Sequence, residues 1–122
     1  MNSNFSFEKS FRLLNKNDFH QLRNGSRFFV SNILLFHVKE NGRGHSRLGL
    51  AVSRKYGNAV KRNAFKRKVR DFFRNSDLKN SGVDILILPN NKKIISNKFT
   101  YNYVEDAIAR SIENAFNKEF KR

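Results

Sequence analysis

Residues 47–74 read RLGLAVSRKYGNAVKRNAFKRKVRDFFR, and this stretch decides how the chain is expected to fold. Its first part alternates large apolar residues with small ones, Leu48, Leu50 and Val52 with Gly49, Ala51 and Ser53. A period of two predicts a strand, and small side chains on one face indicate that something packs or binds closely there. After Gly57 the sequence predicts a helix that Asn58 caps and that ends near Arg74.

The predicted helix has one apolar stripe and one strongly basic face. On a helical wheel the apolar residues fall within about a third of the circumference, and they are Phe65, Val69, Phe72 and Phe73. The neighbouring face carries cations at steps of four, namely Arg62, Lys66, Arg70 and Arg74, with Asn63 and Arg67 beside them. Lys61 and Lys68 flank the stripe on its other side.

This charge pattern opposes helix formation. Each like-charge pair four residues apart destabilises an isolated helix by about 0.2–0.5 kcal/mol. Arg67 and Asp71 form the favourable pair expected at that spacing. Lys61 and Arg62 lie in the first turn, where the helix dipole favours acids. Because solvated faces normally mix signs, a face of one sign indicates binding to a polyanion.

The composition indicates the same kind of partner. The 122 residues contain 25 Lys and Arg against 10 Asp and Glu, a net charge of +15, which favours a nucleic acid. An anionic membrane is disfavoured, because no expected helix combines a basic face with a Trp-rich or Leu-rich one. The absence of cysteine excludes disulfides, thiolate zinc sites and cysteine nucleophiles. We expect one domain over residues 1–122, soluble and cytoplasmic, with no membrane partner.

The remaining sequence completes an α-β-β-α-β-α order. A short helix is expected at 16–23, one long strand at 28–38 with room for a further short strand near residue 28, and a buried strand at 83–88. Residues 89–97 read as a loop. A last amphipathic helix carries its apolar face on Val104, Ala107, Ile108, Ile112, Ala115, Phe116 and Phe120. This order predicts an α+β fold with helices packed on one sheet.

Residues 47–74 resemble the signature region of the bacterial ribonuclease P protein family. That signature is a strand ending in V-[SA]-[KR]-K, a G-N-A-V turn, and a helix with R-N-R-x-K-R-x-x-R. It is matched here by Ser53, Arg54, Lys55, Gly57, Asn58, Ala59, Val60, Arg62, Asn63, Lys66, Arg67 and Arg70. The segments 13–19 and 84–88 fit the family as well. The sequence departs from the family pattern in two places: Ala64 replaces an arginine, and Leu22-Arg23 stands where an aromatic is usual.

The resemblance implies a two-layer α/β sandwich with a central mixed sheet and a left-handed β-α-β crossover. It also implies that a catalytic RNA subunit, using bound Mg²⁺, removes the 5′ leader of precursor tRNA. Mg²⁺ would be held mainly by the RNA and the substrate, and one protein would bind each RNA. The protein would hold the RNA subunit and the leader.

Site residues follow from this resemblance and from their chemistry. RNA contacts are expected from Arg54, Lys55, Asn58, Lys61, Arg62, Asn63, Lys66, Arg67 and Arg70, with helix capping as the first role of Asn58. Leader contacts are expected from Phe19, Phe36 and Ser53, and core packing is an equal alternative for the two phenylalanines. His37 is a further candidate for lining the leader cleft. No catalytic or metal-binding residues are expected in this chain.

Three other functions would also use a basic helix. A ribosomal or other structural RNA-binding protein would explain the charge, but not the ordered helix after G-N-A-V. A double-stranded DNA-binding protein would place the same helix in a major groove. An autonomous nuclease would need catalytic groups, whereas His20, His37 and His45 lie on different elements with no ligand spacing.

Overall fold

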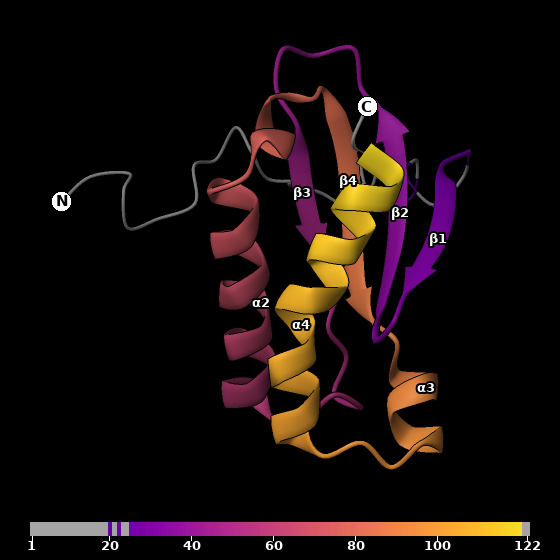
Figure 1. The fold of residues 1–122 in the computed structure, drawn as a ribbon, viewed down its shortest axis with the longest axis vertical. Helices are drawn as coiled ribbons and strands as arrows, with labels where there is room; N and C mark the ends of the chain where they lie inside the picture. Colours follow the sequence, from indigo (N-terminus) through magenta and orange to yellow (C-terminus); the bar gives the residue numbers. More distant parts are fainter. Residues whose placement is uncertain (1–19, 21, 23–24, 121–122) are drawn as a thin grey trace, which may run out of the picture.

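The structure is a computed structural model that describes residues 20, 22 and 25–120 (Figure 1). Its strands are β1 (Arg27–Ser31), β2 (Leu34–Glu40), β3 (Arg47–Leu50) and β4 (Val83–Pro89). Its α-helices are α2 (Ala59–Arg74), α3 (Asn91–Ser96) and α4 (Tyr101–Ala115), with a 3-10 turn η2 (Asp77–Asn80) and a π turn η3 (Phe116–Phe120). Within the described residues, no helix has the length and apolar character needed to cross a membrane.

The four strands form one mixed sheet in the order β1-β2-β4-β3. β2 pairs antiparallel with β1 and β4, whereas β3 and β4 are parallel neighbours joined through α2. In Figure 1 both parallel strands point down, β4 lies to the right of β3, and α4 lies in front of the sheet, on the face against which α2 also packs. The β3-α2-β4 crossover is therefore left-handed, as the family resemblance implied and against the usual right-handed rule.

α2 and α4 cover one face of the sheet and form the main core with it. The buried residues of α2 are Phe65, Val69 and Phe73, with Phe72 packed at the margin, so the predicted apolar stripe is confirmed. The last amphipathic helix is confirmed as far as Ala115, with Val104, Ala107, Ile108, Ser111, Ile112 and Ala115 buried. Of the two further predicted positions, Phe116 packs partly buried against the core from η3, and the side chain of Phe120 lies outside the described residues. We call this side of the sheet the covered face.

The opposite side, which we call the open face, has a smaller apolar cluster. Leu22 is buried there with Leu86, and Ala51 and Leu88 pack against the two. Ala51, one of the small residues of the predicted strand, thus packs in the cluster that contains Leu22. The predicted helix at 16–23 lies mostly outside the described residues, although His20 and Leu22 are helical.

Two expected segments differ from the structure. Residues 28–38 form two strands, because Asn32 takes a positive φ of 51° and reverses the chain into a hairpin. Residues 89–97 are not a loop: Asn90 caps α3 by accepting a hydrogen bond from the Lys93 amide at 3.2 Å. Ile94 of this short helix packs against the main core.

Candidate nucleic-acid interface

The loop before α2 is tied to the helix it introduces. The Asn58 side chain accepts a hydrogen bond from the Lys61 amide at 3.0 Å, which confirms its predicted capping role. The Arg62 guanidinium donates to the Gly57 carbonyl at 2.7 Å. Arg54 and Lys55 are exposed in the same loop. These two hydrogen bonds fix the loop relative to the first turn of α2.

The cations of α2 divide between two flanks of the helix. The outer flank, as we call it, carries Arg62, Asn63, Lys66, Arg67 and Arg70. The inner flank faces α4 and carries Lys61 and Lys68. The Lys61 ammonium lies 4.7 Å from the Tyr101 ring centroid, within cation–π range. Lys61, one of the predicted RNA-binding residues, thus contacts α4.

The inner flank also contains Ala64, the residue of α2 that departs from the family signature. Ala64 lies three residues after Lys61 and four before Lys68, so helical spacing places it between them. The Lys68 ammonium lies 3.2 Å from a carboxylate oxygen of Glu105 and 3.0 Å from its carbonyl oxygen. Both lysines that neighbour Ala64 therefore contact α4.

Asp71, the acid of the basic helix, pairs differently from the prediction. Its carboxylate accepts from the Arg74 guanidinium at 3.1 Å, three residues along, in place of the expected pairing with Arg67. Both partners are substantially exposed, so this pair contributes little to stability. The exchange leaves Arg67 exposed on the outer flank.

Tyr56 joins the loop before α2 to α4. Its hydroxyl donates to Glu105 at 2.5 Å, and its ring meets Phe65 edge-on at 5.2 Å. Burial raises the pKa of Tyr56 far above its usual value, and the bond to the Glu105 carboxylate raises it further. The pKa of Tyr101 is raised in the same direction by burial and by Glu105. Tyr56 therefore remains a protonated donor throughout the physiological pH range.

The predicted leader residues do not gather on one surface. Phe19 lies outside the described residues. Ser53 is exposed, and its hydroxyl oxygen accepts from the Asn91 amide at 3.1 Å. Phe36 is 0% exposed and stacks on Phe29 in the covered face, with centroids 4.9 Å apart. Stacking of Phe36 on a base is wrong for this structure, because its ring is enclosed by the core, and the packing alternative holds.

The open face carries an aromatic pair: the sequence had named His37 as a candidate, but it had not pointed to Phe28. Phe28 is 53% exposed, and its ring lies 4.9 Å from that of its cross-strand partner His37, tilted by 48°. Val30 is exposed on the same strand. The alternation of side chains along a strand could have revealed this pair. Because Phe36 faces the core, the next residue, His37, faces the opposite side of the sheet, and so does Phe28, its partner on β1.

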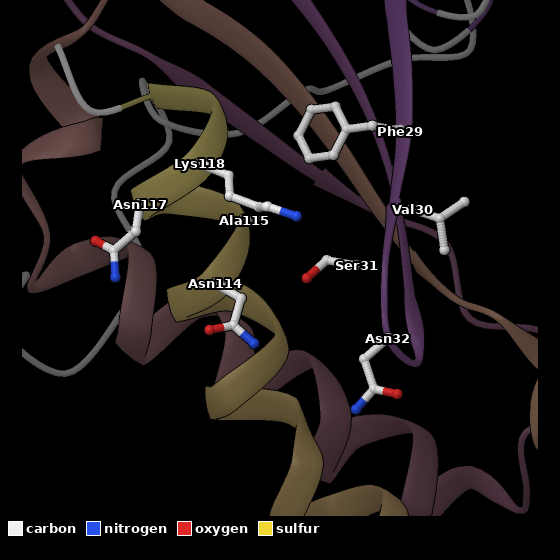
Figure 2. Close-up of a pocket in the computed structure, with 8 residues that line it drawn as sticks. All are labelled: Phe29, Val30, Ser31, Asn32, Asn114, Ala115, Asn117 and Lys118. Carbon is white, nitrogen blue, oxygen red and sulfur yellow. The ribbon is translucent and has the colours of Figure 1, made fainter.

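A hollow of about 400 Å³ lies elsewhere, between β1 and the C-terminal end of α4 (Figure 2). It is lined by Phe29, Val30, Ser31, Asn32, Asn114, Ala115, Asn117 and Lys118. Lys118 is the one cation of this lining, so the hollow does not extend the basic surface of α2. Within residues 20, 22 and 25–120, no three His, Asp or Glu side chains are grouped to hold a metal ion.

The sequence matches the family Ribonuclease P over residues 7–118. The chain belongs to the ribonuclease P protein family. It is 32% identical to the ribonuclease P protein component of Finegoldia magna, over 94% of this chain and 99% of that one. It is 34% identical to that of Desulfosudis oleivorans, over 93% and 89%.

Solved ribonuclease P proteins share the fold. The Staphylococcus aureus protein superposes with a TM-score of 0.70 at 25% identity, covering 93% of this chain and all of that one (100%). The Thermotoga maritima protein gives 0.68 at 27% identity, covering 90% and 98%. Membership in the ribonuclease P family implies an RNA partner and supports a role in an endoribonuclease complex that processes tRNA.

Proposed function

We propose that this protein binds the catalytic RNA of ribonuclease P through the outer flank of α2 and holds the 5′ leader of precursor tRNA on the open face of its sheet. The observation that carries the proposal is the division of the α2 cations. The inner lysines contact α4, whereas Arg62, Lys66 and Arg70 follow one another along the other side of the apolar stripe.

The outer flank suits phosphates of a folded RNA. Phe65, Val69 and Phe73 fix the helix in the core, so the cations project from a rigid support. Successive cations at steps of four residues are about 6 Å apart along the helix axis, so the outer flank can contact several phosphates at once. Arginine adds a planar fork that binds phosphate through two parallel hydrogen bonds. Such contacts fix the register of the RNA without reading its sequence.

The open face suits a single strand. Phe28 and His37 offer aromatic surface on which unpaired bases stack. Ser53 presents an exposed hydroxyl, and because it accepts from Asn91, its own proton is available for a leader oxygen. Phe28 thus takes the role that the sequence suggested for Phe36.

In this proposal the chemistry belongs to the RNA. Mg²⁺ prefers phosphate and water oxygens in octahedral geometry, which the RNA and the substrate supply. This chain contributes positive charge that lowers the repulsion between the two RNAs and thereby favours binding of substrate and metal. We propose one protein for each RNA subunit and a cytoplasmic site of action.

The test is cleavage of a precursor tRNA at physiological Mg²⁺ with ribonuclease P RNA alone, with this protein alone, and with both. We expect stimulation by the combination and no cleavage by the protein alone. Cleavage without RNA would favour an autonomous nuclease. No stimulation with the cognate RNA would favour a structural RNA-binding protein without processing activity.

The RNA contact is tested by Arg62→Ala and Arg70→Ala. Each should lower the dependence of log K on log salt by about 0.7–0.9, as expected for one lost phosphate contact. Arg110→Ala, an exposed arginine on α4, is the matched control and should leave the slope unchanged. Unchanged slopes for the α2 variants, together with lower thermal stability, would show that these arginines are structural.

A further inference from the structure

Glu105 is an acidic residue of α4 that contacts α2. α2 and α4 run side by side in the same direction (Figure 1). The Glu105 side chain is 13% exposed, whereas that of its partner Lys68 is 45% exposed. A half-exposed lysine on a basic helix would ordinarily extend into solvent and reach any nearby phosphate. Here its ammonium is held against α4.

Both oxygens of the Glu105 carboxylate are engaged. One lies 3.2 Å from the Lys68 ammonium, and the other accepts from the Tyr56 hydroxyl at 2.5 Å. The Glu105 carbonyl oxygen accepts from the same ammonium at 3.0 Å. One residue of α4 therefore holds a lysine of α2 and the loop that leads into α2. One turn earlier, Tyr101 holds Lys61.

We infer that Glu105 determines RNA specificity as a positioning residue: it withdraws Lys68 from the RNA-binding surface and fixes the rotation of α2, so that the outer flank meets the RNA. This inference rests on the proposed function. Each additional cation that reaches phosphate strengthens binding to all RNAs alike. A chain with a net charge of +15 gains selectivity when such a cation is removed from the surface.

The variant that tests this is Glu105→Gln in the full-length protein. Glutamine keeps an acceptor for Tyr56 but loses the charge that holds Lys68. For an unrelated single-stranded RNA, we expect the salt slope to steepen by about 0.7–0.9, the value for one added phosphate contact. Affinity would then fall about threefold more than in the wild type between 50 and 200 mM salt. The preference for ribonuclease P RNA over the unrelated RNA should decrease.

A double variant assigns the effect to Lys68. Glu105→Gln combined with Lys68→Ala should return the slope to the wild-type value. Lys68→Ala alone should leave the slope unchanged, which also tests the inference if Glu105→Gln fails to fold. Asp106→Asn is the matched control, because Asp106 is the exposed neighbour of Glu105 on α4 and its loss changes the net charge equally.

Three results would overturn the inference. The first is an unchanged slope for a folded Glu105→Gln protein. The second is a lower slope for Lys68→Ala, which would mean that Lys68 already contacts RNA. The third is an equal steepening of the slope by Asp106→Asn, which would mean that the change in net charge alone causes the effect. Failure of the proposed function is recognised separately, because Arg62→Ala and Arg70→Ala would then leave the slope for ribonuclease P RNA unchanged.

Discussion

Two aromatic pairs on the same two strands have opposite surroundings. Phe29 and Phe36 stack with centroids 4.9 Å apart, and both belong to the covered face. One register step away, Phe28 and His37 also lie 4.9 Å apart, but on the open face. The difference comes from what covers each face: α4 packs over the strands of the first pair, where Phe36 is fully buried, whereas half of Phe28 remains accessible. Aromatic side chains thus stabilise the fold on one face and remain available to a ligand on the other.

The largest expected effect is that of Phe36→Ala. Removing a fully buried phenylalanine costs its transfer free energy and leaves a cavity, so we expect about 3–5 kcal/mol of lost stability. Denaturant unfolding measures this loss. Phe28→Ala makes the same chemical change on the open face and should lower the unfolding free energy by much less. Equal losses for the two variants would remove the distinction between the faces.

The next effect concerns the polar end of the open face. Asp84 accepts two hydrogen bonds from Arg47, at 2.9 and 2.7 Å, and one from Asn41 at 2.8 Å. Burial acts to raise the pKa of Asp84, but these hydrogen bonds and the nearby guanidinium charges outweigh it, and the pKa is lowered. A lowered pKa means that the folded state prefers the ionised form. The resulting stabilisation is complete above the unfolded pKa of about 3.9 and is lost as pH falls toward the folded value.

We therefore expect Asp84→Asn to cost about 1.5–3 kcal/mol near neutral pH, the usual range for hydrogen bonds to a charged group. The wild-type protein should lose this advantage in acid, so the two unfolding free energies should converge below about pH 4. Thermal or denaturant unfolding across pH measures the convergence. Asp106→Asn, an exposed carboxylate on α4, should leave both the stability and its pH dependence nearly unchanged.

How far the sequence predicts this fold depends on whether a feature is local. The α2 stripe, its Asn58 cap and the face of α4 follow from spacing within one helix, and all three were predicted. The hairpin at Asn32 was not, because the turn lies inside an apolar run and its second residue, Ile33, is fully buried. α3 was missed because a cap and one short apolar pair, in a polar stretch after Pro89, gave too little periodicity.

The sequence could not predict the contacts between α2 and α4, and these contacts divide the cations of the site. The sequence placed seven cations on α2 but did not show which of them contact α4. Lys61 and Lys68 find their partners some forty residues away, and no local pattern marks Tyr101 or Glu105 as those partners. The sequence also did not show which of Phe28 and Phe36 faces the core. That depends on which side of the sheet the helices cover.

A third effect tests whether the open face binds the leader. Phe28→Ala should weaken binding of precursor tRNA by about 1–2 kcal/mol, within the range for one base stacked on an aromatic side chain. Binding of mature tRNA, which lacks the leader, should change little, and affinities for the two substrates measure the difference. Val30→Ala, an exposed apolar residue on the same strand, is the control. Equal loss for both tRNAs would indicate that Phe28 contacts the tRNA body or supports the fold.

The smallest effect is expected at Ser53, which lies three residues beyond the end of β3. Its hydroxyl oxygen accepts from Asn91, so its proton points away from that amide and is available to a leader oxygen. Ser53→Ala should weaken precursor binding by about 0.5–1.5 kcal/mol, the usual net value of one hydrogen bond, and leave mature tRNA binding unchanged. Asn91→Ala should have a smaller effect in the same direction, because it frees the hydroxyl to rotate without removing it. If Asn91→Ala weakens precursor binding more than Ser53→Ala does, α3 itself contacts the leader, and the open face extends beyond the sheet.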